Sequence, residues 1–288
     1  YFFFSHYFNL SNHTEEKKYL LKFERRILFL FLSWSLFYIP FILKNNIIIL
    51  SESKNLIGSI LRILYAFFYP VPIAGNGWGQ SWYLIAVIMG LPIFLFIYTV
   101  LNKNLILIGA FLICIEVYYV LANGYDFLTH FSNFGTYAFP RILIYIFLGM
   151  FVAKYKLALL KNGIYLYVAI ALLLTVQFLL ENILILHFGG KNDEELILTA
   201  PTSLAITFVS LKWAPRIKQP LFLRNFSTFL YCFQTYPLSI FRKVLHKIPV
   251  NRIFNTFILF VLIILFTYFV FLAYRAIYRK TETVKYFV

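Results

Sequence analysis

A basic segment, Lys22-Phe23-Glu24-Arg25-Arg26, stands directly before a long apolar run. Its three cations can bind a phosphorylated ligand, because ammonium and guanidinium groups donate charge-assisted hydrogen bonds to phosphate oxygens. The same cations can instead anchor the end of a helix at the cytoplasmic face of a membrane. Charge alone leaves both interpretations open.

Two ionisable residues, Glu116 and Arg141, stand within or at the edge of apolar runs. A charged side chain at the centre of a bilayer costs roughly 2.5–3.5 kcal/mol on insertion scales, so such residues are candidates for function. Glu116 is either a proton-handling or substrate-facing carboxylate, or a hydrogen-bonded structural group. Arg141 is either an anion clamp or a helix-end side chain that reaches the interface. We take both as candidate catalytic residues.

Aromatic and polar pairs add weaker signals. Trp82 and Tyr83 follow a glycine-rich stretch just before a span, where they either line a site or belong to an aromatic belt. Gln177 and Glu181 lie four residues apart and share a helix face, which predicts either a polar cavity near the outer leaflet or a helix end that meets water. No histidine has a second histidine or a carboxylate at ligand spacing, so we predict no metal site.

The composition identifies the surroundings of these residues. Of the 288 residues, 61% are hydrophobic and only 13% are charged, whereas soluble domains carry about a quarter charged residues. A backbone in lipid needs internal hydrogen-bond partners, which only helices and closed barrels provide. The alternation typical of barrel strands is absent from the sequence. The sequence therefore predicts an all-α fold, a polytopic transmembrane helix bundle.

Eight runs approach the length of about 20 apolar residues that a helix needs to cross about 30 Å of hydrocarbon. They are residues 27–43, 81–101, 105–123, 139–153, 164–184, 197–213, 228–241 and 252–274. The stretch 56–74 carries Arg62 in its middle and predicts an interfacial or re-entrant helix in the largest extracytoplasmic loop, 44–80. We expect one domain over residues 1–288.

The lysines and arginines between the runs predict the orientation. With residues before 27 in the cytoplasm, the cytoplasmic side, which then includes Arg224 and Arg275, carries roughly twice as many of these cations as the opposite side. They also explain the net charge of +15, so we expect the lipid bilayer and no nucleic acid as a partner. The expected location is a cell membrane, most simply a bacterial inner membrane. Because the chain opens without Met inside an aromatic run, Tyr1–Phe4, we expect it to be truncated at its N-terminus.

Four segments, in their order along residues 1–240, resemble acyltransferase family 3, a family of polytopic membrane enzymes. They are YFFFSHYF followed by YLLKFERRILFLFLSWSLFYIP, then SWYLIAVIMG, then FPRILIYIFLGMFVAKYK, and last LRNFSTFLYCFQTYPL. The resemblance implies a helix bundle of about ten spans, of which this chain lacks the first and most of the second.

The family moves an acyl group, often acetyl from acetyl-CoA, to a hydroxyl of a surface polysaccharide or another acceptor. The resemblance implies acyl-CoA as a donor substrate bound from the cytoplasm, a carbohydrate acceptor, and no permanently bound cofactor. It places five residues at the donor site: Lys22, Arg25 and Arg26 at the CoA phosphates, and Trp82 and Tyr83 in the lining. The family carries a pair of arginines three residues apart, which corresponds either to Lys22 with Arg25 or to Phe23 with Arg26. Arg141 would point into the site, where an arginine can stabilise the oxyanion of the reaction.

Three positions depart from the family pattern. The first span of the family carries a histidine thought to act as general base, and that span is not in this chain. Gln234 stands where a late histidine is expected, and Gln80 or Ser81 where a histidine often precedes Trp82. The alternative function is a transporter or flippase of lipid-linked glycans without acyl transfer, for which broken helices around a midplane site are expected.

Overall fold

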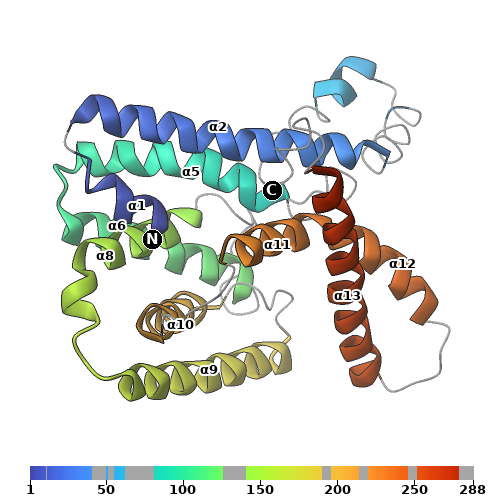
Figure 1. The fold of residues 1–288 in the computed structure, drawn as a ribbon. Helices are drawn as coiled ribbons and strands as arrows, with labels where there is room; N and C mark the ends of the chain where they lie inside the picture. Colours follow the sequence, from blue (N-terminus) through green and yellow to red (C-terminus); the bar gives the residue numbers. More distant parts are fainter. Residues whose placement is uncertain are drawn as a thin grey trace. The chain divides into compact units, whose positions relative to one another are not determined.

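The computed structural model describes residues 1–10, 12–40, 50, 55–61, 81–125, 141–189, 196–213, 220–245 and 252–278. Every regular element in these ranges is a helix, which confirms the predicted all-α class (Figure 1). Five helices are long and apolar enough to cross a membrane, namely Ser81–Val100, Leu105–Ala122, Ile142–Leu159, Ile164–His187 and Phe254–Ile277. The protein is therefore a multi-pass membrane protein.

The chain divides into two compact units. Unit 1 comprises Tyr1–Leu21 and Ala86–Arg216, and unit 2 comprises Lys22–Ile85 and Ile217–Val288. Helices α2 (His13–Phe37) and α5 (Ser81–Val100) contribute residues to both units. The expectation of one domain over 1–288 stays a prediction.

Unit 1 is built from apolar helices that pack closely at glycines. Its further elements are α1 (Phe2–Tyr7), α6 (Leu105–Tyr119), the π-helical η1 (Val120–Gly124), α8 (Ile142–Leu159), α9 (Ile164–His187) and α10 (Thr199–Trp213). A Cβ added at Gly90 of α5 would lie 2.5 Å from Cγ2 of Ile142 on α8, and one at Gly109 of α6 would lie 3.0 Å from Cζ of Phe147. Glycine therefore lets α8 approach two neighbouring helices.

A tight turn joins α5 to α6, as the sequence Asn102-Lys103-Asn104 predicts. Asn102 and Lys103 adopt positive φ values of 50° and 60°, a conformation that asparagine tolerates better than most residues. The side-chain oxygen of Asn104 then accepts hydrogen bonds from the backbone N–H groups of Ile106 and Leu107 at 3.1 and 3.3 Å. This asparagine is the N-cap of α6 and fixes where the helix begins.

Unit 2 has an aromatic core between α2 and the C-terminal helices. It contains α11 (Pro220–Phe233), α12 (Thr235–Leu245) and α13 (Arg252–Tyr278). Trp34 of α2 is 1% exposed, and its ring lies 5.4 Å from that of Phe229 on α11. Tyr38 donates a hydrogen bond to the backbone oxygen of Cys232 at 2.8 Å. These contacts hold the C-terminal half of α2 against α11.

The structure corrects the expected count of about eight spans to five among the described residues. The run 197–213 becomes α10, whose 15 residues extend only about 22 Å. The run 228–241 is divided between α11 and α12 at Gln234. The run 27–43 is described to residue 40 and continues a helix that begins at His13 with many charged residues. Of the predicted re-entrant helix 56–74, residues 56–61 are described and helical, and the rest lies outside the described residues.

Candidate functional site

A cavity of about 840 Å³ lies within unit 2. Side chains of α2, the start of α5, α11 and α13 line it. Its volume falls within the range of about 300–1,000 Å³ that is typical of small-molecule sites. Among the described residues, the charged members of the lining are three arginines, Arg26, Arg224 and Arg275, and no carboxylate. The cavity is therefore strongly cationic.

Helical periodicity places these side chains on the cavity. On α2, the lining residues Phe23, Arg26, Ile27 and Leu30 recur at intervals of three or four and so share one face of the helix. On α11, Arg224 is followed at the fourth position by Thr228, which also lines the cavity. Each helix thus presents one arginine together with apolar or hydroxyl side chains.

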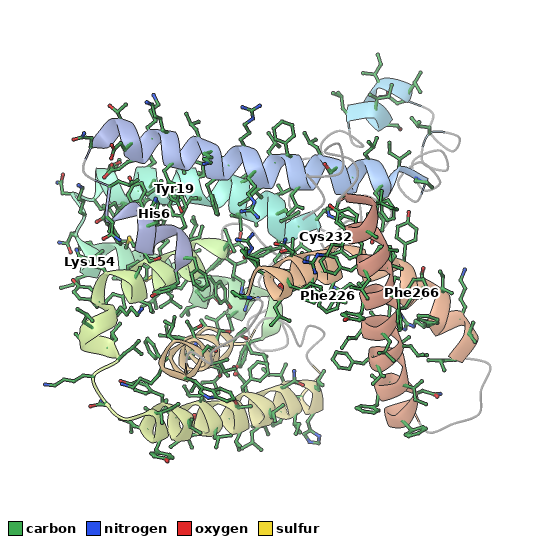
Figure 2. All side chains as sticks on the ribbon, in the orientation of Figure 1. His6, Tyr19, Lys154, Phe226, Cys232 and Phe266 are labelled. Atoms are coloured by element: carbon green, nitrogen blue, oxygen red, sulfur yellow. The ribbon has the colours of Figure 1, made fainter. Side chains whose placement is uncertain are left out.

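Aromatic packing sets α11 against α13. Phe226 and Phe229 of α11 lie 5.6 and 5.4 Å, between ring centroids, from Phe271 of α13. Figure 2 labels Phe226 and Cys232 on α11 and Phe266 on α13. Because Phe271 is one helical turn before Arg275, this packing positions the Arg275 guanidinium at the cavity. Its carbon Cζ lies 5.1 Å from the ring centre of Phe222, within the range of a cation–π contact.

The three guanidinium groups keep their capacity to bind an anion. Nε and Nη2 of Arg224 donate to the side-chain oxygen of Asn225 at 3.3 and 3.2 Å, and Arg275 has the aromatic contact with Phe222. Within the part of the chain that the structure describes, none of the three lies in an ion pair. Their positive charges are therefore not neutralised by these residues.

Only some of the donor-site residues predicted from the family resemblance line this cavity. Arg26 and Tyr83 belong to its lining, whereas Lys22, Arg25 and Trp82 do not. Arg25 instead lies 5.3 Å over the ring of Phe29. Trp82 makes an edge contact with Tyr83 at 6.0 Å between ring centroids.

Arg224 and Arg275 belong to the lining but were read from the sequence only as cations of the cytoplasmic side. The signal that could have singled them out is this shared side, since Arg26, Arg224 and Arg275 are all predicted at cytoplasmic helix ends. Tyr83, by contrast, opens a run predicted to start at the outer face. The lining of the cavity on α11 runs from Leu221 to Cys232, about 16 Å at 1.5 Å per residue, which is about half of the hydrocarbon thickness of about 30 Å.

Unit 1 contains a second arrangement of charge, formed by the two predicted catalytic residues. Nε of Arg141 donates to Oε1 of Glu116 at 3.1 Å, and their side chains are only 11% and 10% exposed. Nη2 of Arg141 also lies 3.5 Å from the hydroxyl of Tyr145. The other carboxylate oxygen of Glu116, Oε2, is buried and has no hydrogen-bond partner among the described residues. The pair is nearly neutral overall and offers one free acceptor.

The local structure around this pair is irregular. Glu116 lies in the last helical turn of α6, directly before the π-helical η1. Arg141 is the N-cap residue of α8, next to Ile142, which packs over Gly90. π-helical turns are frequent at functional sites. The close approach at Gly90 therefore helps to fix the position of Arg141 relative to Glu116.

Glu181 in unit 1 accepts hydrogen bonds that link the end of α9 to the start of α10. Its carboxylate accepts hydrogen bonds from the hydroxyl of Tyr125 at 2.5 Å and from the backbone N–H groups of Ile197 and Leu198 at 2.8 and 3.0 Å. Both N–H groups stand directly before α10, so Glu181 closes the connection between α9 and α10. Gln177, its predicted neighbour on the helix face, is exposed.

Glu24 is an acid of α2 in unit 2 and does not line the cavity. Its oxygen Oε1 is buried without a hydrogen-bond partner among the described residues. Burial raises the pKa of Glu24 to about 7. This carboxyl therefore changes charge near neutral pH.

Histidine and the other ligand types do not gather into a metal site among the described residues. His6 packs on Tyr19, with 4.6 Å between ring centroids, where α1 meets α2 (Figure 2). Gln234, the residue at the position of the late family histidine, stands between α11 and α12 and is half-buried. The glycine-rich residues 75–80 and the loop around His130 lie outside the described residues.

Comparisons of this chain with protein-family models, curated proteins and solved structures gave no match. The helices define the class of protein: an all-α membrane protein that crosses the bilayer several times. The resemblance to acyltransferase family 3 rests on the four sequence segments.

Proposed function

We propose that this protein is a membrane-bound acyltransferase. It moves an acyl group, most simply acetyl, from acyl-CoA to a hydroxyl of a surface polysaccharide or a similar acceptor. The observation that carries the proposal is that Arg26 and Tyr83, two residues that the family resemblance assigns to the donor site, line one cationic cavity. The cavity has the size of a ligand site, and the order of the four sequence segments points to the same reaction.

The reaction requires a base and a group that stabilises negative charge. The acceptor hydroxyl oxygen attacks the thioester carbonyl carbon, so a C–O bond forms while the C–S bond breaks. The hydroxyl proton leaves to the base and ends on the CoA sulfur, which departs as a thiol. General-base catalysis contributes about 10²–10⁴-fold to such steps.

Within unit 1, the two predicted catalytic residues, Glu116 and Arg141, form a pair with the groups that such a reaction needs. Oε2 of Glu116 has no partner among the described residues and can accept a proton. Arg141 holds the opposite oxygen of the same carboxylate at 3.1 Å and keeps it oriented. A guanidinium in a water-poor site also stabilises a developing oxyanion.

A second candidate, a transporter or flippase of lipid-linked glycans, is favoured by one observation. The predicted span 228–241 is broken at Gln234 between α11 and α12. Broken helices commonly surround the midplane site of a transporter. The two candidates differ in whether a covalent bond to the acyl group forms.

Label transfer distinguishes them. Membranes from cells that express the full-length gene are incubated with radiolabelled acetyl-CoA and longer acyl-CoAs, and label is measured in the isolated glycan. We expect transfer by the wild type and its loss in Glu116→Gln and Arg141→Gln, with the label normalised to the amount of each variant in the membrane. The matched control is Arg242→Gln, because Arg242 is exposed and does not line the cavity. Glycan movement across the membrane without label transfer from any donor would contradict the enzyme and support the transporter.

A further inference from the structure

We infer that the cavity of unit 2 is a binding site for a ligand that carries at least two phosphate groups, held jointly by Arg26, Arg224 and Arg275. The site itself follows from the geometry of unit 2. Its assignment to the acyl donor rests on the proposed function. Arg224 and Arg275, which the family resemblance does not place at the donor site, are the new members.

Electrostatics is the first step of the argument. Three positive charges line a cavity whose described lining residues include no carboxylate. Arg26 and Arg224 are exposed and Arg275 is half-buried, so the charges keep contact with solvent but still repel one another around one cavity. An anion in the cavity relieves this repulsion. The number of arginines then favours a ligand with more than one negative charge.

The second step of the argument concerns the helices that carry the three arginines. They come from three helices, α2, α11 and α13, so their side chains approach the cavity from different directions. A single carboxylate offers two oxygens and is satisfied by one guanidinium fork. Each phosphate offers three oxygens, and two linked phosphates present acceptors over a wider arc. The geometry therefore matches a diphosphate or a bisphosphate better than a simple carboxylate.

The remainder of the lining is the third step. From Arg224 the cavity continues along α11 to Tyr231 and Cys232, about 12 Å at 1.5 Å per residue. Tyr231 meets Tyr83 there, with 5.8 Å between ring centroids in an edge arrangement. A ligand that fills the cavity is thus phosphorylated at one end and has a less polar arm at the other.

Two kinds of molecule share this chemistry. One is a nucleotide thioester of the CoA type, whose phosphates are followed by an uncharged arm that carries the acyl group. The other is a membrane lipid with two phosphates in its headgroup. Both would place phosphates at the arginines and the less polar arm toward the tyrosines, so the experiment must separate them.

Binding to the purified full-length protein tests the site. The probes are acetyl-CoA, S-acetylpantetheine, which lacks phosphates, and cardiolipin in phosphatidylcholine nanodiscs. We expect Arg224→Gln and Arg275→Gln each to raise the Kd of a phosphorylated probe about tenfold, because a hydrogen bond to a charged group is lost. The triple Gln variant should lose at least about a hundredfold. S-acetylpantetheine should bind weakly and equally to all variants.

Two controls keep the test specific. Arg242→Gln removes the same charge from unit 2 outside the cavity and should leave every Kd unchanged. Arg224→Lys keeps the charge and should restore part of the affinity, which a loss of folding would not allow. Equal affinity of the wild type and the triple variant for both acetyl-CoA and cardiolipin would overturn the site. Arginine-dependent binding of cardiolipin but not of acetyl-CoA would support the site and contradict the proposed function.

Discussion

The two units treat positive charge in opposite ways. In unit 1, Arg141 lies against Glu116 at 3.1 Å, and both side chains are almost fully buried. In unit 2, Arg26, Arg224 and Arg275 line a cavity, and they are more exposed to solvent than the unit 1 pair. None of the described lining residues is a carboxylate. In unit 1, a carboxylate of the protein neutralises the positive charge of the arginine. In unit 2, the described lining residues do not neutralise the positive charge of the three arginines.

This difference separates two uses of an arginine in a membrane protein. An internal ion pair makes a nearly neutral unit whose loss leaves a buried charge unpaired. A set of arginines around a cavity gains its compensation only when an anion arrives. We therefore expect substitutions in unit 1 to change stability strongly, and substitutions of the cavity arginines to change ligand affinity with little effect on stability.

The largest effect is expected from Glu116→Leu. The change leaves the Arg141 guanidinium buried without its carboxylate, which should lower the free energy of unfolding by about 3–5 kcal/mol. Thermal unfolding in detergent and membrane abundance measure this loss. The double variant Glu116→Leu with Arg141→Met replaces the pair by apolar side chains and should recover most of the stability. A double variant that is as unstable as the sum of both single variants would contradict an internal pair.

A smaller loss is expected from Gly90→Ala in unit 1. The added methyl group would lie 2.5 Å from Cγ2 of Ile142, so α8 must shift at the turn that carries Arg141. Overpacking of this kind costs about 1–3 kcal/mol, and label transfer should fall with it. Gly163→Ala is the control, because a Cβ there meets nothing within 4 Å. Equal melting temperatures for both variants would show that α8 tolerates the methyl group.

Glu24 contrasts with Glu116, because its buried oxygen Oε1 has no hydrogen-bond partner among the described residues and no arginine pairs with it there. This carboxyl predicts a pH effect. Burial raises its pKa from 4.5 to about 7, so the folded protein binds the proton more tightly than the unfolded chain does. Stability from this group is fully present below the unfolded pKa and is lost as pH rises to about 7. Glu24→Gln stays neutral, so its advantage in melting temperature over the wild type should grow between pH 4 and pH 8. A constant difference across this range would rule out the titration of Glu24.

The smallest change in stability is expected from Arg224→Gln. The side chain is exposed at the cavity, and its described hydrogen bonds go only to the neighbouring Asn225. Substitutions of this kind usually change the free energy of unfolding by no more than about 0.5 kcal/mol. Melting curves without ligand should therefore overlay those of the wild type. A loss comparable to that of Glu116→Leu would place Arg224 in an internal network instead.

The apolar runs and the missing strand alternation together predicted the fold class, because a backbone in lipid must satisfy its hydrogen bonds within helices or a closed barrel. Span lengths were harder to predict. The run 228–241 is apolar enough to suggest one helix, but Gln234 ends α11 and the chain restarts as α12. The hydropathy of a segment shows whether it can cross a bilayer, but it does not show where a helix ends within that segment.

For the candidate sites, the sequence shows the residue types, but it does not show which of these residues lie close together in the fold. Arg26 and Tyr83 entered through the family resemblance, whereas Arg224 and Arg275 reach the cavity only because Phe226 and Phe229 pack against Phe271. Glu116 and Arg141 were separate candidates until the fold brought them within 3.1 Å. Such long-range contacts depend on tertiary packing, which periodicity and charge do not encode.

The central claim is that a phosphorylated donor sits on the arginines of unit 2. Its most direct test is modification of arginines by phenylglyoxal in the purified full-length protein, mapped by mass spectrometry with and without acetyl-CoA. The account predicts that acetyl-CoA protects Arg26, Arg224 and Arg275, while the exposed Arg242 reacts equally in both samples. Equal modification of all four arginines, at an acetyl-CoA concentration that supports label transfer, would contradict it.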